Sequence, residues 1–285
     1  MGDLMRVWIG HGVEGAFVDR EAARVSAFDH GFTVGDGVFE TMRLAKGRVF
    51  LWPWHLERLH AAADMMGIAL PDDAHLTAVV RDVAREFVDD ERARLRITVT
   101  SGAGPAGTVR GTDACTLVVA GASVSPWPAT TKLMFVDWPR NEHSPLIRVK
   151  STSYAECVLA LSAAQRAGFD EGVFLNTEGR ITEGTGSNVF IVRDDFVLTP
   201  PLSDGLLPGI TRRFVLSLGD AAIPIREQSI TRAELESADE VFITSSTRDI
   251  QPVERVGAQV YGIGPITRAL QARFADRAQS EQHWL

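Results

Sequence analysis

The sequence has few of the features that mark secreted or metal-binding proteins. It contains only two cysteines in 285 residues, and both Cys115 and Cys157 lie in apolar patterns, where a reduced thiol behaves as a small hydrophobic side chain. No disulfide framework is therefore expected. The seven histidines show no H-x-x-x-H spacing and the cysteines no C-x-x-C spacing, so we expect no metal site.

Long apolar runs and blocks of basic residues are also missing. The longest apolar runs, such as residues 115–122, are far shorter than the roughly 20 residues of a membrane-spanning helix. The first residues lack the basic and apolar segments of a signal peptide. With a net charge of -8, the chain has no electrostatic match to nucleic acid or to an anionic membrane. We expect a cytoplasmic protein with neither of these partners.

What the chain has is the composition of an ordinary globular protein, with 45% hydrophobic and 23% charged residues. Its length suffices for two domains. Residues 121–130 contain two prolines, which do not fit a central strand or helix and favour a linker. We therefore expect an α+β protein with a small α/β domain at residues 1–120, a linker at 121–130 and a larger domain at 131–285.

Hydrophobic periodicity and turn residues predict the elements of both parts. In the first part, strands are predicted at residues 6–10, 38–44, 49–51, 95–100 and 115–120, with helices at 53–66 and 73–88. In the second part, strands are predicted at 132–137, 189–193 and 240–244 and in the apolar stretch that ends at Lys150. A hairpin is predicted at 172–182, and helices at 153–167, 211–218 and 266–275.

Lys150 is the residue of greatest chemical interest. It closes the apolar stretch Pro145-Leu-Ile-Arg-Val and precedes a helix-like run, while Glu183 lies in a glycine-rich turn between two strand-like segments. A lysine at the edge of a cavity loses hydration, which favours the neutral amine that attacks carbonyl groups. This pattern indicates Schiff-base chemistry. The alternative is an ordinary strand-end lysine whose stem covers apolar surface.

Three places suit a phosphate group. Leu207-Pro-Gly-Ile-Thr211 puts a glycine and a hydroxyl at a helix start, where backbone N–H groups attract anions. Thr244-Ser-Ser-Thr247 follows an apolar strand and offers a cluster of hydroxyls. Arg58 presents a guanidinium that can bind a phosphate with two hydrogen bonds. Each also has a structural explanation, namely a helix start, a turn and a solvated helix residue.

A fourth motif indicates a different class of enzyme. Gly102-Ala-Gly-Pro-Ala-Gly107 fits the dinucleotide fingerprint G-x-G-x-x-G of oxidoreductases. That fingerprint requires a helix directly after the glycines, whereas the sequence predicts another strand, and Pro105 interrupts the turn. We expect a flexible loop near a substrate and retain a dinucleotide oxidoreductase as an alternative.

The order of Arg58, Lys150, Glu183, Gly209-Ile-Thr211 and Ser245-Ser-Thr247 resembles the fold-type IV pyridoxal-phosphate enzymes, the class IV aminotransferase family. Residues 32–41 are similar to the family's N-terminal signature, and the similarity extends over about residues 5–275. This family includes branched-chain aminotransferases, D-amino acid transaminases and aminodeoxychorismate lyases. The resemblance implies a pseudo-barrel second domain, bound pyridoxal 5'-phosphate and a homodimer.

The resemblance also assigns roles to individual residues. It makes Lys150 the catalytic residue that forms a Schiff base with the cofactor, and Glu183 the partner of the pyridine nitrogen. The residues that it places around the phosphate are Arg58, Ile210, Thr211, Ser245 and Ser246. Tyr154 and Asn188 are further candidates for the cofactor's surroundings.

The resemblance leaves the substrate open. The pattern typical of D-amino acid transaminases is Thr-Arg-Gly followed by a histidine, whereas this chain has Thr100-Ser-Gly102 and no histidine nearby. The pattern typical of branched-chain enzymes is Tyr-Ile-Arg-Pro. Arg96 matches its arginine, but the residues around Arg96 do not match the rest of the pattern. Segments such as Ser246-Thr-Arg-Asp-Ile-Gln look most like members often labelled aminodeoxychorismate lyase.

The candidates for binding the substrate carboxylate are Arg96, Arg248, Arg43 and Arg110, with Arg96 first because it lies inside a strand. We expect a transaminase that exchanges an amino group between an amino acid and a 2-oxo acid, with D-amino acids or small (R)-amines favoured. An aminodeoxychorismate lyase, which forms 4-aminobenzoate and pyruvate, and a branched-chain L-amino acid aminotransferase stay open as alternatives.

Overall fold

The computed structural model describes residues 5–285 and divides into two compact units. The first comprises Met1–Pro126, Val149–Tyr154 and Glu281–Leu285, and the second comprises Trp127–Arg148 and Ala155–Ser280. The change from one unit to the other between Pro126 and Trp127 falls inside the expected linker. Residues 149–154 and 281–285, which we expected in the larger domain, cluster with the first unit instead.

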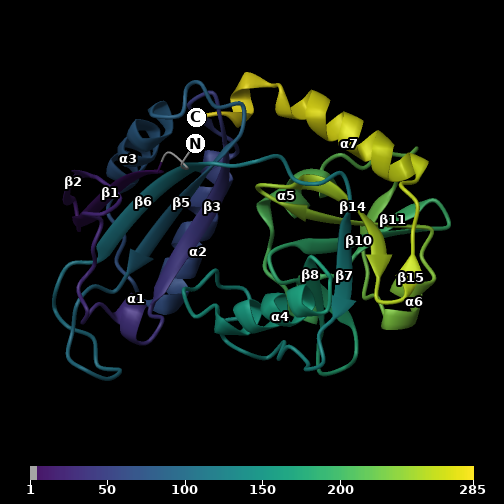
Figure 1. The fold of residues 1–285 in the computed structure, drawn as a ribbon, viewed down its shortest axis with the longest axis horizontal. Helices are drawn as coiled ribbons and strands as arrows, with labels where there is room; N and C mark the ends of the chain where they lie inside the picture. Colours follow the sequence, from purple (N-terminus) through teal and green to yellow (C-terminus); the bar gives the residue numbers. More distant parts are fainter. Residues whose placement is uncertain (1–4) are drawn as a thin grey trace. The chain divides into compact units, whose positions relative to one another are not determined.

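A six-stranded antiparallel sheet forms the first unit, with strand order β2-β1-β6-β5-β3-β4 (Figure 1). The strands are β1 (Met5–His11), β2 (Glu14–Val18), β3 (Gly37–Ala45), β4 (Arg48–Val49), β5 (Ala93–Thr100) and β6 (Thr116–Ser123). The helices are α1 (His30–Thr33), α2 (Trp52–Met66) and α3 (Asp73–Arg85). Strand β6 continues into the segment that we expected to be the linker.

The two faces of this sheet differ sharply. Along β5, Ala93, Leu95 and Ile97 are buried, whereas Arg94 and Arg96 are exposed. Since side chains alternate along a strand, one face carries the buried residues and packs against α2 and α3. We call this the helix-covered face, and the opposite face, which carries Arg94 and Arg96, the open face.

Two remote segments extend the first sheet, which explains why they belong to this unit. Ser151 pairs with Val38 in an antiparallel bridge, and the Phe39 amide donates to the Lys150 carbonyl over 2.8 Å. At the other end of the chain, Leu285 exchanges two backbone hydrogen bonds with Val49, of 3.0 and 3.2 Å. These pairings satisfy backbone groups at a sheet edge that would otherwise be unpaired.

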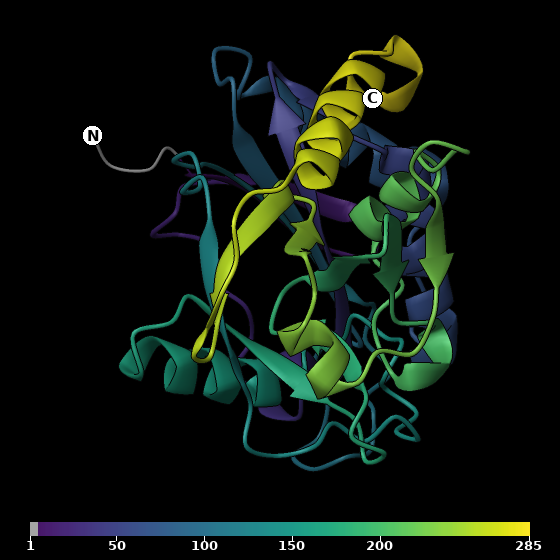
Figure 2. The ribbon, with the colours of Figure 1, turned by 90° about the vertical axis from the view of Figure 1, so that its right-hand side faces the viewer.

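The second unit contains a closed ring of six strands, in the order β10-β13-β14-β7-β8-β9, with β9 pairing back to β10 (Figure 2). They are β7 (Thr131–Phe135), β8 (Glu171–Leu175), β9 (Ile181–Gly184), β10 (Asn188–Arg193), β13 (Glu240–Ser245) and β14 (Asp249–Val256). Strands β11 (Phe196–Thr199), β12 (Ile225–Glu227) and β15 (Gln259–Val260) lie outside the ring. The expected α+β fold with a pseudo-barrel domain is confirmed.

Branched apolar side chains fill this barrel, among them Leu133, Val173, Val189, Ile243 and Val253. The barrel closes at one residue pair, Asn188 with Glu183. A closed sheet has no open edge, so this closing pair fixes where Glu183 lies.

The remaining helices are α4 (Ala155–Arg166), α5 (Ile210–Leu216), α6 (Arg232–Glu236) and α7 (Pro265–Ala278), with the short turns η1 (Leu202–Asp204) and η2 (Glu281–His283). The strand expected in the stretch that ends at Lys150 is a series of turns instead. Periodicity predicted α4, α5 and α7 but missed α1 and α6. It also missed β2, β11, β12, β14 and β15. Among residues 5–285, no helix is both long and apolar enough to span a membrane.

Candidate active site

Lys150 lies on the open face of the first unit. Because Ser151 pairs with Val38, Lys150 stands opposite Phe39, and the two side chains point to the same face. The Lys150 Nζ atom lies 4.4 Å from the ring centre of Phe39 and 5.6 Å from that of Tyr154. The two rings contact each other edge to face at 5.4 Å. Lys150 is thus a half-buried residue whose amine lies against aromatic surface.

Arg96 shares this aromatic support. Its guanidinium carbon lies 3.7 Å from the ring centre of Phe39, and its Nε donates to the Thr98 hydroxyl over 3.1 Å. Partial loss of hydration lowers the pKa of Arg96, and the positive charge of Arg94 acts in the same direction, while Tyr154 opposes both. The structure therefore brings the preferred carboxylate candidate and the lysine to the same ring.

Arg58 lies instead on the helix-covered face, where Glu40 binds it. Its Nε and Nη2 each donate to Glu40 over 2.7 Å, and His55 Nδ1 lies 2.6 Å from the same carboxylate. Burial alone would raise the pKa of Glu40, but Arg58 and His55 outweigh it and lower that pKa to about 2. Two N–H groups of Arg58, which we expected to donate to a phosphate, therefore donate to Glu40 and hold the guanidinium in place.

His55 connects this group electrostatically to Lys150. Burial lowers the pKa of His55, Glu40 opposes the shift, and the charges of Arg58 and Lys150 lower the pKa further. A neutral His55 donates from Nδ1 to Glu40 without adding a third positive charge near Arg58 and Lys150.

In the second unit, Glu183 is surrounded by groups that donate to it or carry positive charge. Arg140 Nη1 lies 2.8 Å from Oε1, and the Leu207 amide donates to Oε2 over 3.0 Å. Asn188 Nδ2 lies 3.4 Å from Oε2 and also donates to the Leu207 carbonyl over 3.0 Å. This arrangement favours a carboxylate anion, the form that can hold a proton on a pyridine nitrogen.

The start of α5 is built for a close approach of backbone groups. Gly209 caps the helix without a side-chain hydrogen bond, and a Cβ atom there would lie 1.9 Å from Asn188 Oδ1. Only glycine fits this position. Ile210 and Thr211, the next residues, are buried.

The second group of hydroxyls follows β13. Ser245 ends the strand and Ser246 lies in the turn, both half-buried. The Thr244 hydroxyl is buried and has no hydrogen-bond partner among residues 5–285. Together with the α5 start, these donors fit a phosphate monoester, and Glu183 in the same unit fits the pyridine nitrogen of pyridoxal phosphate.

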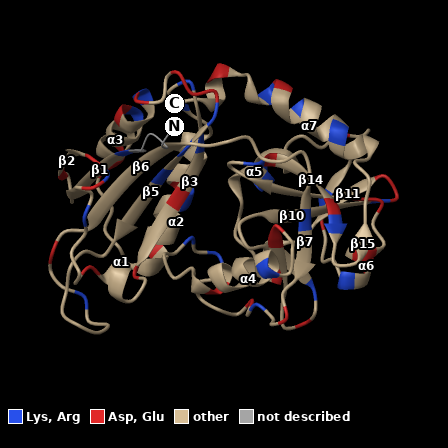
Figure 3. Ribbon diagram, in the orientation of Figure 1, with Lys and Arg blue, Asp and Glu red and all other residues tan. Residues whose placement is uncertain are grey.

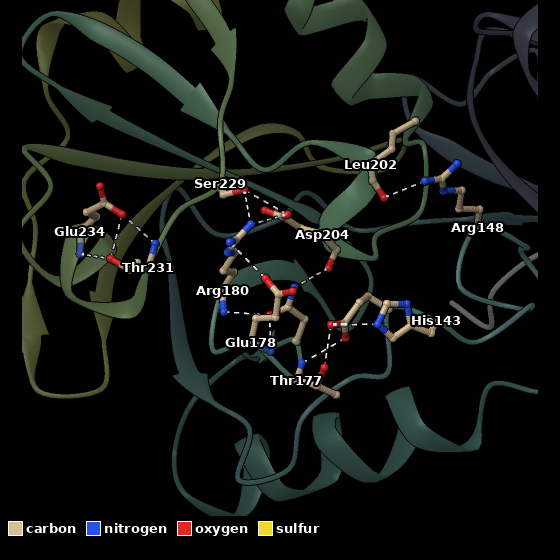
Figure 4. Close-up of polar contacts among 12 residues, drawn as sticks. His143, Arg148, Thr177, Glu178, Arg180, Leu202, Asp204, Ser229, Thr231 and Glu234 are labelled. Carbon is tan, nitrogen blue, oxygen red and sulfur yellow. Dashed lines mark hydrogen bonds and ion pairs between the residues drawn. The ribbon is translucent and has the colours of Figure 1, made fainter.

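A polar network holds the segment that precedes Leu207 (Figure 4). Asp204 is buried and accepts a hydrogen bond from Ser229 over 3.0 Å, with Arg180 at 3.7 Å. Arg148 donates to the Leu202 carbonyl over 3.3 Å. Turn η1 is thereby fixed at both ends, which positions the Leu207 amide on Glu183.

The other arginines considered for binding the substrate carboxylate interact with neighbouring side chains. Arg248 Nη2 lies 3.1 Å from Glu171, its Nη1 donates to Gln251 over 3.0 Å, and its guanidinium carbon lies 4.0 Å from a ring centre of Trp127. Arg43 lies against the rings of Phe50 and Trp284, at 5.7 and 5.4 Å.

Arg110 anchors the glycine-rich loop. Its Nε and Nη2 donate to the two carboxylate oxygens of Asp36 over 2.7 and 2.6 Å. Burial would raise the pKa of Asp36, but Arg110 and Ser101 lower it overall. His30 Nε2 lies 3.0 Å from the Pro105 carbonyl. The loop is thus fixed at two points, and the next element is strand β6 rather than a helix, so the context of a dinucleotide fingerprint is absent.

Comparison with known proteins agrees with this geometry. Residues 37–256 match the model of the amino-transferase class IV family. This chain belongs to the class IV aminotransferases. It is 35% identical to a Methanocaldococcus jannaschii protein provisionally named as a branched-chain-amino-acid aminotransferase, over 93% of this chain and 94% of the relative. It is 31% identical to the aminodeoxychorismate lyase of Bacillus subtilis, over 95% of each chain.

A solved structure of the same family supports the cofactor. The T.th. branched-chain amino acid aminotransferase, complexed with N-(5'-phosphopyridoxyl)-L-glutamate, superposes with a TM-score of 0.88 at 26% identity, covering 98% of this chain and 97% of that one. The chain is accordingly a pyridoxal-phosphate enzyme with aminotransferase chemistry.

Sequence reasoning missed two carboxylates and one arginine that hold candidate site residues in place. Glu40 carried a usable signal, because it lies in the family signature and at a buried position of a predicted strand. Arg140 and Glu171 carried none, since their partners Glu183 and Arg248 are remote in the sequence.

The role of Arg248 is testable through its partner. Glu171 is buried, and its Oε1 accepts hydrogen bonds from the Gly186 amide and the Ser187 hydroxyl. Arg248→Gln leaves this carboxylate without its counter-charge, so we expect the free energy of unfolding in urea to fall by about 3 kcal/mol. The double variant with Glu171→Gln should recover at least half of the loss.

Arg232→Gln is the matched control, because Arg232 forms an exposed pair with Glu236 and such pairs contribute less than about 1 kcal/mol. Unchanged stability of Arg248→Gln together with a raised KM for the substrates would make Arg248 a substrate-binding residue instead.

Proposed function

We propose that the protein is a transaminase for branched-chain L-amino acids that uses a 2-oxo acid as the amino acceptor. The observation that carries the proposal is the placement of Arg96 and Lys150 on the single ring of Phe39, since Arg96 is the residue that matches the branched-chain pattern. The relatives named as branched-chain aminotransferases support it. They favour it over our first expectation of D-amino acids or (R)-amines, for which the usual arginine and histidine are missing.

Pyridoxal phosphate, when bound, supplies an electron sink for the substrate's α-carbon. Lys150 would hold the cofactor through its amine, and as a free amine it would take the α-proton of the substrate and return it. Glu183, held anionic by Arg140 and the Leu207 amide, keeps the pyridine nitrogen protonated. Arg96 binds the carboxylate of the substrate and so orients the α-carbon toward Lys150.

The phosphate is proposed to bind the α5 start and the β13 turn, through Ile210, Thr211, Ser245 and Ser246. Arg58 adds a positive charge, and its two hydrogen bonds to Glu40 fix the orientation of its guanidinium. The family resemblance also favours a homodimer, which sedimentation or light scattering would test.

An aminodeoxychorismate lyase is the second candidate, because a lyase from Bacillus subtilis is 31% identical over 95% of the chain. It would use the same lysine and the same carboxylate, so the substrate alone separates the two functions.

Substitution of the two acting residues tests the chemistry. Lys150→Ala should lower turnover about a thousandfold or more and remove the visible absorbance of lysine-bound cofactor. Glu183→Gln should retain the cofactor but slow turnover, because a neutral amide does not hold a proton on the ring nitrogen. Lys46→Ala and Lys132→Ala, which replace the other two lysines of the chain, are the controls. A Lys150→Ala protein with normal turnover would refute the assignment.

A substrate panel tests the specificity. Leucine, isoleucine and valine, each in the L and D forms, are assayed with 2-oxoglutarate, beside an (R)-amine and aminodeoxychorismate. We expect the L-branched-chain acids to react at least about tenfold faster than the other compounds, which corresponds to about 1.4 kcal/mol of transition-state discrimination. Product from aminodeoxychorismate alone would establish the lyase, and a preference for D-acids would restore the first expectation.

A further inference from the structure

Turn η1 and the residues that follow it, which we call the η1 segment (residues 202–207), contact two functional parts of the second unit. At one end, the Leu207 amide donates to Glu183 over 3.0 Å. At the other, the Leu202 carbonyl accepts from Arg148 over 3.3 Å, and Arg148 lies two residues before the proposed Schiff-base lysine in the chain. The η1 segment is thus hydrogen-bonded both to the proposed partner of the pyridine nitrogen and to the chain that leads to the lysine.

Gly205 allows the chain before Arg148 to approach the η1 segment closely. Its φ of +89° lies in the left-handed region that favours glycine. A Cβ atom there would lie 2.6 Å from the Cβ atom of Glu142 and 2.8 Å from its Cα atom. The Glu142 carboxylate in turn accepts from the Thr177 amide over 3.1 Å and from the Thr177 hydroxyl over 2.6 Å. This contact therefore depends on the absence of a side chain at Gly205.

Asp204 is the residue whose side chain fixes the η1 segment (Figure 4). Its Oδ1 atom accepts from the Ser229 hydroxyl over 3.0 Å, and Arg180 Nη1 lies 3.7 Å from the same oxygen. Its backbone carbonyl accepts from Asn176 Nδ2 over 3.3 Å. Asn176 and Arg180 flank the turn between β8 and β9, and β9 carries Glu183. The η1 segment is therefore held on this hairpin both at its tip and beside the Glu183 carboxylate.

The burial of Asp204 is costly for the fold. Acidic residues occur mainly in the loops and helices of the molecule (Figure 3), and Asp204 is one of the few that are only 3% exposed. Its Oδ2 atom is buried and has no hydrogen-bond partner among residues 5–285. Arg180 is 44% exposed, so water weakens its attraction to this carboxylate. A buried carboxylate that is only partly satisfied lowers stability, and such groups are found chiefly where function requires them.

We propose that Asp204 is a positioning residue for transamination, which fixes the η1 segment and so keeps the Leu207 amide on Glu183. The inference rests on the proposed transaminase function, in which Glu183 keeps the pyridine nitrogen protonated. Asp204 acts through Glu183 rather than on the cofactor itself. Without its side chain the η1 segment moves more freely, so the Leu207 amide no longer holds the Glu183 carboxylate in one orientation.

The first test follows the motion of the η1 segment in the purified protein. Amide hydrogen exchange of residues 202–207 is measured by mass spectrometry. Asp204→Ala should raise the exchange rate there about tenfold or more, since a hydrogen bond to a charged group is lost. Asp204→Asn keeps an acceptor for Ser229 and should stay within about threefold of the native rate. The melting temperature of Asp204→Ala should shift by less than about 3 °C, because the variant also removes a buried oxygen without a partner.

The second test follows the cofactor in the holoenzyme, which is reconstituted with pyridoxal phosphate carrying 15N in the ring. In Asp204→Ala the chemical shift of the ring nitrogen should move toward the value of the unprotonated ring. The kcat for transamination should fall about tenfold, with KM within about twofold, because Glu183 acts in the chemical step and not in substrate binding. A merely structural role would leave the nitrogen shift of the folded enzyme unchanged.

Glu178→Gln is the matched control, because Glu178 lies 3.1 Å from the same Arg180 but is 57% exposed. It should change neither the exchange rate nor the nitrogen shift. Ser229→Ala removes only the donor to Asp204 and should raise the exchange rate in the same way, which keeps the test decisive if Asp204→Ala does not fold.

Two results would overturn the inference: native exchange in both Asp204→Ala and Ser229→Ala, or faster exchange with an unchanged nitrogen shift and kcat. In either case the native enzyme still transaminates, so the proposed function stands. A native protein that transaminates no amino acid contradicts the proposed function instead, and the exchange rates still decide whether Asp204 fixes the η1 segment.

Discussion

The pairing of residues 150–152 with the start of β3 is the constraint on which the account of the open face depends. Lys150 is more than a hundred residues from Phe39 in the chain, yet one backbone hydrogen bond and one bridge put the two side chains opposite each other. The register then fixes what lies next to the amine, namely aromatic surface first and arginine second. A shift of one residue would turn Lys150 to the helix-covered face, toward Glu40.

Paired charges do the corresponding work elsewhere in both units. Glu40, Asp36, Glu183 and Glu171 each hold one arginine, and three of these four carboxylates are buried. Breaking such a pair would leave a charge without a partner, at a high cost in free energy. This cost holds the paired groups in place. The candidate residues of each unit therefore lie on rigid elements: the β3 pairing in the first unit, and the barrel closure at Glu183 and the glycine at the start of α5 in the second.

Much of the fold followed from hydrophobic periodicity. Strands β3, β5 and β10 and helices α2, α3 and α7 were predicted within a few residues, because each has a clear apolar face. Strand β2 was missed since nearly all its residues are exposed, and β14 because Pro252 and several charged residues obscure its alternation. The order of Lys150, Glu183 and the two segments proposed to bind the phosphate indicated the family and its chemistry. The pairing of Arg140 with Glu183 and that of Arg248 with Glu171 could not be predicted from the sequence, since both depend on long-range register.

The central claim is that the Lys150 amine carries the cofactor in the resting enzyme. The chain contains only three lysines, Lys46, Lys132 and Lys150, so the claim has a sharp test. The purified holoprotein is reduced with borohydride, digested, and its labelled peptide sequenced by mass spectrometry. The account predicts a phosphopyridoxyl group on Lys150 in close to one copy per chain. A label on Lys46 or Lys132, or no label in a protein that retains its colour and activity, would contradict it.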